Sequence, residues 1–291
     1  MTVAEDVPLA AAPELSSVRQ PSREEAISLF RGGLAEAIQD VAASYVIPVC
    51  WITARDRRPW ILDNGSSFLL DCGEGPFLVT ANHVFRGFLA AKEAHPDAVC
   101  MLGDLRFDPA SRLIGSDLAY DVATFRVTQD EVSHLRAYTG GKLVLQGSQA
   151  TWPPEPPPQV ERGVFFVGFP GDGRQMRPYR GNSIVGIDWT GYTALAVASG
   201  VSTTDVTLIF DHEHDFDIGL RPTIPDDWAL GGCSGAPLLT FVDQRGIFSW
   251  RLGGIIYESS SLILKASRAD CLNPDGTLNR YPDPMAYRRR S

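Results

Sequence analysis

Long hydrophobic runs are missing from this sequence of 291 residues. No stretch reaches the roughly 18 consecutive apolar residues that a membrane-spanning helix needs. The first residues, MTVAEDVPLAAAPELSS, have neither a basic start nor a sustained apolar core, so they do not predict a signal peptide. We therefore expect no membrane segment and a cytoplasmic location.

Positive charge is also scarce. The chain has 26 lysines and arginines against 35 aspartates and glutamates, which gives a net charge of -9 and an isoelectric point near 5.0. A protein that binds nucleic acid needs a basic surface to meet the phosphates. The balance of charge therefore argues against a nucleic-acid partner.

Cysteine is too rare and too scattered for a disulfide framework, because an odd number of widely spaced residues does not pair up. A cytoplasmic protein keeps its thiols reduced in any case. The five cysteines are Cys50, Cys72, Cys100, Cys233 and Cys271.

What the sequence does contain is a series of short strand-like runs from about residue 46 onward. Runs such as FLVTA, VFFVGF and APLLTFV are rich in β-branched and aromatic residues, and Gly, Asp, Asn and Pro separate them. About a dozen runs with little helical pattern between them predict an all-β barrel or sandwich architecture. The proline-rich segment 151–159 cannot lie inside a sheet, so we place the connection between two β halves there.

The regions outside the strands are few. Residues 1–21 are small and acidic and are expected to be flexible, whereas residues 22–45 have the apolar spacing of an amphipathic helix. Ser22 followed by Glu25 is a capping-box pattern, which marks the start of that helix. We expect the folded domain to span 46–270 and residues 271–291 to form a C-terminal tail.

Three short segments carry residues suited to nucleophilic catalysis. His83 follows the strand-like run FLVTAN, Asp121 begins the run DVATFRV, and Ser234 lies in the glycine-flanked turn GGCSGAP. A serine hydroxyl becomes a good nucleophile when a histidine removes its proton. A buried carboxylate then orients the imidazole, and His, Asp, Ser is one of the chain orders in which such a triad occurs.

These segments resemble the trypsin-like serine peptidases of the chymotrypsin fold. The stretch GSSFLLDCGEGPFLVTANHVF is similar to the hairpin that leads to the catalytic histidine, in the style of bacterial HtrA-like enzymes that are not secreted. YDVATFRV and GGCSGAPLL resemble the segments of the aspartate and the serine, with Ala236 in place of the family's second glycine. The resemblance implies two antiparallel six-stranded β-barrels, catalysis by His83, Asp121 and Ser234, and an added N-terminal helix.

Two of these assignments have local competitors. Asp117 also precedes an apolar residue and an alanine, but a strand that starts there meets the charge of Asp121 within four residues, so we favour Asp121 and expect a turn at Asp117. Cys233, the neighbour of Ser234, could also serve as the nucleophile. The serine register is preferred because it places Gly232, Gly235 and Pro237 where the family has them, whereas the cysteine register does not.

The same alignment implies the surroundings of the nucleophile. The backbone N–H groups of Gly232 and Ser234 are expected to form the oxyanion hole. Trp228, Ile256 and Tyr257 are expected to wall the substrate pocket, the last two from the run GGIIYE, and GIFSW at 246–250 is treated as a chance similarity. Asp226 and Asp227 lie close enough to leave a preference for basic side chains open.

No cofactor and no metal are expected. The run DHEHD at 211–215 has a metal-like composition, but His212, Glu213 and His214 lie too close together for the helical His-x-x-x-His arrangement, and a solvated loop is preferred. The predicted function is a serine endopeptidase whose partner is a protein or peptide substrate. The main alternative is a silent protease-like module that binds a peptide or partner protein, and an esterase with the same triad is a further one.

Overall fold

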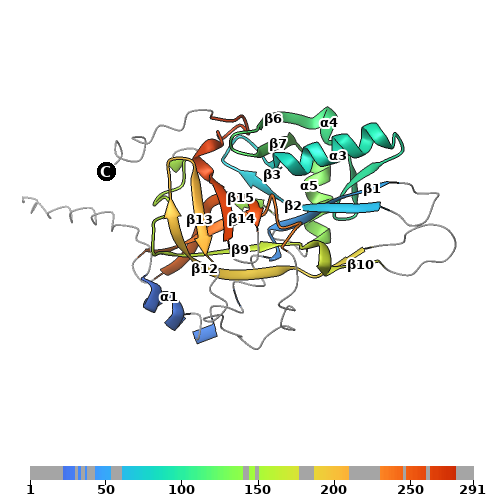
Figure 1. Ribbon diagram of the computed structural model, residues 1–291. Coiled ribbons are helices and arrows are strands. Elements are labelled where there is room, and N and C mark those ends of the chain that lie inside the picture. The colour runs from blue at the N-terminus through green and yellow to red at the C-terminus, as the bar shows by residue number, and fades with distance from the viewer. Residues whose placement is uncertain are drawn as a thin grey trace, which may run out of the picture.

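Strands dominate the part of the chain that the structure describes. The computed structural model describes residues 22–29, 32–33, 37, 43–53, 61–139, 144–147, 151–176, 187–209, 230–244, 247–259 and 263–279. These strands form two curled bodies that lie against each other (Figure 1). Among the described residues, no helix combines the length and the apolar character needed to cross a bilayer.

The first body is a single eight-stranded sheet in the order β5-β4-β1-β2-β3-β7-β6, with β8 pairing in parallel with β2. Among the described residues no pairing closes this sheet on itself. Its strands are β1 (Val46–Thr53), β2 (Ile61–Asp71), β3 (Phe77–Ala81), β4 (Val99–Leu102), β5 (Leu105–Phe107), β6 (Leu113–Asp117), β7 (Val122–Arg126) and β8 (Val144–Gln146).

The second body is a closed six-stranded barrel in the order β12-β13-β16-β15-β14-β9. A separate hairpin, β10 (Arg174–Met176) with β11 (Ile187–Trp189), precedes β12 in the chain. The two bodies confirm the predicted all-β double-barrel fold. The barrel strands are β9 (Gly163–Gly168), β12 (Tyr192–Val201), β13 (Asp205–Ile209), β14 (Pro237–Gln244), β15 (Ile247–Ser259) and β16 (Ile263–Arg268).

Helices between the strands are the main departure from the sequence-based expectation. Besides the short α4 (Pro109–Arg112), α3 (Asn82–Ala94) follows β3 directly, and α5 (Gln129–Tyr138) follows β7. The N-terminus of α5 has a capping box formed by Thr128 and Glu131. Short amphipathic helices such as these are stabilised mainly by the surface they cover, so a pattern read along the chain alone underestimates them.

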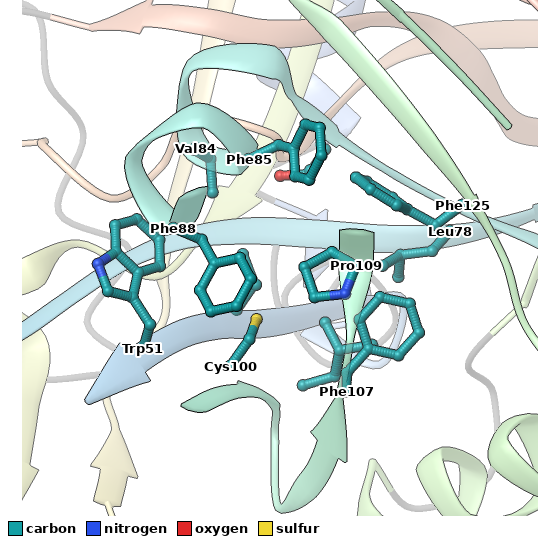
Figure 2. Close-up of a pocket in the computed structure, with 12 residues that line it drawn as sticks. Trp51, Leu78, Val84, Phe85, Phe88, Cys100, Phe107, Pro109 and Phe125 are labelled. Atoms are coloured by element: carbon teal, nitrogen blue, oxygen red, sulfur yellow. The ribbon is translucent and has the colours of Figure 1, made fainter. Parts of the chain in front are cut away.

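Helix α3 covers the open sheet of the first body. Val84, Phe85 and Phe88 are its buried apolar residues, and they face Cys100 and Phe107 of the sheet (Figure 2). Burial of apolar surface stabilises a folded protein by roughly 25 cal/mol per Å². The buried side chains of α3 therefore anchor the helix on the sheet, and His83 with it.

A shared apolar core joins the two bodies. Phe68 and Phe77 from the first sheet and Phe165 and Phe241 from the barrel belong to one buried cluster. The proline-rich connection also contributes, because Trp152 is buried in this cluster and its indole Nε1 donates to the carbonyl of Leu272 over 2.7 Å. One apolar cluster thus has residues from both bodies.

After β16 the chain returns to the first sheet. The hydroxyl of Thr124 on β7 donates to the carbonyl of Gly276 over 2.6 Å, and Leu278 packs beside Gly115 on β6. The 3-10 helix η5 (Ala269–Cys271) begins this segment. Residues 271–279, which the sequence analysis assigned to a tail, therefore pack against β6 and β7.

The start of the predicted N-terminal helix lies in the described part of the chain as α1 (Arg23–Leu29). The N–H of Ser22 donates to Glu25 Oε2 over 2.7 Å, and the N–H of Glu25 donates to Ser22 Oγ over 3.3 Å, so the predicted capping box is present. The rest of the predicted helix, to residue 45, lies largely outside the described residues.

Candidate active site

His83 is the second residue of α3, directly after the buried strand β3. Its neighbours Asn82 and Val84 are buried, whereas the His83 side chain is 51% exposed. A helix that begins at the end of a buried strand thus places an accessible imidazole at the edge of the first sheet.

Asp121 faces this histidine through two contacts. The backbone N–H of His83 donates to Asp121 Oδ1 over 2.7 Å, and His83 Nδ1 lies 2.5 Å from Asp121 Oδ2. The carbonyl of Asp121 in turn accepts from the N–H of Asn82 over 2.8 Å. Because the carboxylate accepts the Nδ1 proton, the other ring nitrogen, Nε2, is left unprotonated in the neutral imidazole.

Asp121 holds this position in an uncommon backbone conformation. Its φ is +50°, in the left-handed region that aspartate tolerates better than most residues. It closes the turn between β6 and β7, and the hydroxyl of Ser267 on β16 donates to the carbonyl of the preceding residue, Tyr120. A contact from the second body therefore secures the turn that presents Asp121.

Asp117 has the role of a turn residue. Its Oδ1 accepts from the N–H groups of Ala119 and Tyr120 over 2.7 and 3.2 Å. These contacts close an Asx-type turn. The structure thus brings Asp121, and not Asp117, to His83.

Ser234 lies in a turn between residue 230 and the start of β14. Gly232 and Gly235, on either side of it, have φ values of +101° and +91°, which a side chain would disfavour. Ser234 is 7% exposed, and its carbonyl accepts from the N–H of Ser66 on β2 over 2.8 Å. The turn is therefore docked on the first sheet.

This docking places Ser234 close to the start of α3. A Cβ added to Gly235 would lie 2.0 Å from the Ser66 carbonyl oxygen and 2.9 Å from the amide nitrogen of Ala81. A Cβ added to Gly65 would meet both Val84, the neighbour of His83, and the Ser234 carbonyl, at 2.6 and 3.2 Å. Glycines at these positions allow the two segments to approach.

The hydroxyl of Ser234 points toward Tyr257 and not toward His83. Ser234 Oγ lies 3.5 Å from the carbonyl oxygen of Tyr257, at the limit of a weak hydrogen bond. Within the described part of the chain, no hydrogen bond joins Ser234 Oγ to His83. The pair His83–Asp121 is formed, whereas the contact between serine and histidine is not.

Cys233 is enclosed in the barrel core. It is fully buried, and burial raises the pKa of its thiol, which keeps the sulfur protonated. Its side chain packs against Gly168 on β9, where an added Cβ would lie 2.9 Å from Cys233 Sγ. A protonated thiol without solvent access has the character of a small apolar side chain.

The N–H groups of Gly232 and Ser234 are available as donors. In the described ranges of the chain, neither of them donates a hydrogen bond. The N–H of Cys233 between them is used, because it donates to the Leu230 carbonyl over 3.0 Å. The two N–H groups that the sequence analysis predicts for the oxyanion hole are thus not used in hydrogen bonds among the described residues.

The three residues predicted to wall the substrate pocket lie in different surroundings. Ile256 is fully buried in the barrel core, and its N–H and carbonyl bond to Ala236 and Gly235 over 2.9 and 2.7 Å. Tyr257 is half-buried, and burial together with the nearby charge of Asp205 raises the pKa of its hydroxyl, which bonds to that carboxylate over 3.1 Å. Trp228 lies outside the described residues.

No group of three or more metal-ligating side chains occurs among the residues that the structure describes. The run 211–215, like Asp226 and Asp227, lies outside them. Three polar groups that surround the turn were not predicted from the sequence: Ser66 and Asn64 on β2, and Gly171 after β9. Ser66 stands beside a second serine, Ser67, and Gly171 is one of several glycines in its region. No feature of the sequence therefore distinguishes these residues from others of the same type.

Comparisons with known proteins give fold-level likenesses only. No protein-family model matches the chain, and no curated protein matches it in sequence. It is similar to the structure described as "Crystal structure of Deg5", with 17% identity, 81% of this chain and 88% of that chain covered, and a TM-score of 0.42. It is also similar to a chain of the structure described as "Aromatic interactions drive the coupled folding and binding of the intrinsically disordered Sesbania mosaic virus VPg protein". The identity is 14%, the match covers 77% of this chain and 92% of that chain, and the TM-score is 0.38. Likenesses at this level assign no residue and no activity.

Proposed function

We propose that the protein is a serine endopeptidase that cleaves peptide bonds through His83, Asp121 and Ser234. The observation that carries this proposal is the double contact between His83 and Asp121, at 2.7 and 2.5 Å, beside the docked turn of Ser234. A structural histidine needs only one hydrogen bond, whereas a carboxylate that holds both the backbone and the ring fixes the tautomer that a general base requires.

The proposed reaction starts with a rotation of the Ser234 side chain away from Tyr257 and toward His83. Oγ then attacks the carbonyl carbon of the substrate while His83 Nε2 takes its proton. The new oxyanion accepts from the N–H groups of Gly232 and Ser234. His83 returns the proton to the leaving amine. In the second half of the reaction, water attacks the acyl carbonyl while His83 takes its proton, and His83 then gives this proton to Ser234 Oγ as that oxygen leaves.

The substrate in this proposal is a protein or peptide, and the cytoplasm remains the expected location. Neither a metal nor a cofactor takes part in these steps. Trp228, Asp226 and Asp227, which the sequence places near the expected specificity pocket, lie outside the described part of the chain.

One observation favours a second candidate, a protease-like module that binds a peptide without cleaving it. Ser234 Oγ is directed at the Tyr257 carbonyl, and the hydrogen bond to His83 is not formed. Catalytic contacts are often loose before substrate binds, so this geometry is compatible with an enzyme as well.

A fluorophosphonate probe separates the two candidates. An enzyme should become covalently labelled at Ser234, and Ser234→Ala should remove the label without changing the thermal unfolding of the protein. Wild-type protein that is folded, resists labelling and cleaves no member of a peptide library would support the binding module. A comparison of ester and amide substrates on the unlabelled enzyme would distinguish an esterase.

A further inference from the structure

The turn 231–234 is held from outside by a serine of the first sheet. Ser66 is fully buried on β2, far from the turn in sequence. Its hydroxyl donates to the carbonyl of Gly232 over 2.8 Å and accepts from the N–H of Phe169 over 2.9 Å. Its own N–H donates to the carbonyl of Ser234 over 2.8 Å. One residue thus binds the turn at Gly232 and at Ser234, and also binds the residue that follows β9.

We propose that Ser66 is a positioning residue, whose hydroxyl keeps this turn in the form that offers the N–H groups of Gly232 and Ser234 to an oxyanion. The proposal rests on the proposed hydrolase function. It makes the oxyanion site a product of contacts between the two bodies, rather than of the turn alone.

Peptide planarity is the physical reason. In a trans peptide the carbonyl of one residue and the N–H of the next point in opposite directions. The Gly232 carbonyl, held by Ser66, therefore turns the N–H of Cys233 the other way, toward the Leu230 carbonyl. The Cys233 carbonyl accepts from Ala236 over 3.0 Å, which directs the N–H of Ser234 away from that side.

A second contact fixes the remaining peptide. The N–H of Gly171, in the 3-10 helix η3 (Gly171–Gly173), donates to the Gly231 carbonyl over 2.7 Å. A reversal of the peptide between Gly231 and Gly232 would break this bond and turn the Gly232 N–H out of the oxyanion site. Ser66 and Gly171 therefore act on successive peptides of the same turn.

The segment that carries Gly171 is itself anchored. Asn64 on β2 donates from Nδ2 to the carbonyl of Phe169 over 2.8 Å, and Arg174 Nη1 donates to Asn64 Oδ1 over 2.8 Å. Asn64 is buried, so both ends of its amide are satisfied inside the protein. The first sheet thus holds the turn directly through Ser66, and indirectly through the end of β9.

The neighbouring serine provides a matched control. Ser67 is also fully buried on β2, but its hydroxyl donates to the Ile47 carbonyl over 3.0 Å, within the first sheet. Ser66→Ala and Ser67→Ala both remove a buried hydroxyl. Only Ser66→Ala should lower kcat, by about 10- to 100-fold with KM unchanged, because the loss of one oxyanion donor costs about 100- to 1,000-fold and a misplaced turn loses part of that.

Gly171 provides an independent pair of variants. Gly171 is the first residue of η3 and follows Pro170, whose φ of -62° and ψ of 147° suit a residue before proline. Gly171→Pro therefore removes the N–H donor and also places its ring Cδ against the Gly231 carbonyl, which must move away. Gly171→Ala keeps the donor, and its Cβ would meet its nearest atom at 3.4 Å. We expect Gly171→Pro to lower kcat and Gly171→Ala to retain it.

Crystal structures of the four variants test the same idea without any activity. The peptide between Gly232 and Cys233 should be reoriented in Ser66→Ala, and the peptide between Gly231 and Gly232 in Gly171→Pro. Both peptides should be unchanged in Ser67→Ala and Gly171→Ala. An unchanged turn in both Ser66→Ala and Gly171→Pro would overturn the inference. So would wild-type kcat in Ser66→Ala, a result that leaves the proposed function standing. A wild-type protein without any hydrolysis would defeat the proposed function instead, and the turn geometry would still decide on Ser66.

Discussion

The carboxylate of Asp121 receives the backbone N–H of His83 on Oδ1 and faces the ring Nδ1 of the same residue with Oδ2, over 2.7 and 2.5 Å. The first contact holds the carboxylate on the backbone of His83, and the second restrains the imidazole ring. They leave Nε2 as the ring nitrogen that is free to exchange protons.

Asp121→Asn should retain the fold and lose most turnover. The asparagine oxygen can still accept from the His83 N–H, but its NH2 group then faces Nδ1 and favours the tautomer with the proton on Nε2, which is no longer a base. The corresponding change in a known triad costs about 10⁴-fold in kcat. Asp117→Asn is the matched control, because an amide oxygen can still close that turn. Equal losses in both variants would contradict the assignment of Asp121.

Hydrolysis should depend on Ser234 and not on Cys233. Loss of a triad nucleophile costs on the order of 10⁴ to 10⁶ in turnover. Ser234→Ala should therefore abolish both turnover and labelling by a fluorophosphonate. Cys233→Ala should keep most activity and lose some stability, since it opens a small cavity in the barrel core. An active Ser234→Ala together with an inactive Cys233→Ala would end the serine assignment.

Gly235→Ala should disrupt the turn. The new Cβ would lie 2.0 Å from the Ser66 carbonyl and 2.3 Å from Thr80 Oγ1, at a φ of +91°. Overlap with backbone cannot be relieved by a rotamer change, so we expect a loss of roughly 3 kcal/mol or more in the free energy of unfolding. Ala236→Gly, the change toward the pattern of the peptidases that the sequence resembles, should cost about 1 kcal/mol and preserve labelling. Chemical denaturation of both variants measures the difference.

The protein should need no proteolytic activation. In trypsin-like zymogens an aspartate before the catalytic serine receives a new N-terminal ammonium, whereas Cys233 is neutral and enclosed here. An ammonium buried without a partner would be strongly unfavourable. Full-length protein should therefore carry a fluorophosphonate label, as mass spectrometry of the intact chain can show. Labelling confined to a truncated form, and induced by trimming, would refute this expectation.

Alkaline pH should destabilise the fold through the buried thiols. Burial raises the pKa of all five, to about 12 for Cys50 and Cys72, while in the unfolded chain they ionise near 8.5. The folded state then holds more protons, so stability is full below about pH 8.5 and falls as the pH rises toward 12, by about 1.4 kcal/mol per pH unit for each thiol.

Urea unfolding under reducing conditions between pH 7.5 and 10 tests this dependence. Cys100→Ala should be less stable at every pH but should show a shallower slope, because one thiol no longer titrates. A stability that stays constant over this range in the wild type would argue that the thiols are not shielded from solvent.

The strands and the order of the chemical groups could be predicted from sequence because both are local signals. Alternating apolar runs marked β3, β7 and β9, and glycines marked the turn around Ser234. The competition between Asp117 and Asp121 was also decided by local pattern, and the structure places Asp121 at His83. Helix α3 was missed, because its apolar face has meaning only against the open sheet that it covers.

The contacts of Ser66 could not be predicted for a different reason. A buried serine and its neighbour are equivalent in sequence, and only the pairing of β2 with distant segments makes the Ser66 hydroxyl face the turn while Ser67 faces β1. The same holds for Gly171, whose N–H meets a carbonyl 60 residues later in the chain (171 to 231). Such roles arise from tertiary contacts that no short motif encodes.

Because residues 272–278 return to the first sheet, that sheet is synthesised well before the segment that packs on it. On the ribosome, β6 and β7 emerge about 150 residues before the segment that covers them (from Thr124 to Gly276), and synthesis at about 5 to 20 residues per second makes this a delay of several seconds to half a minute. During that interval His83 and Asp121 already exist, but the sheet that carries them lacks its last packing partner. In a nascent chain, the sheet that carries His83 and Asp121 therefore stays without this contact until Gly276 has emerged from the ribosome.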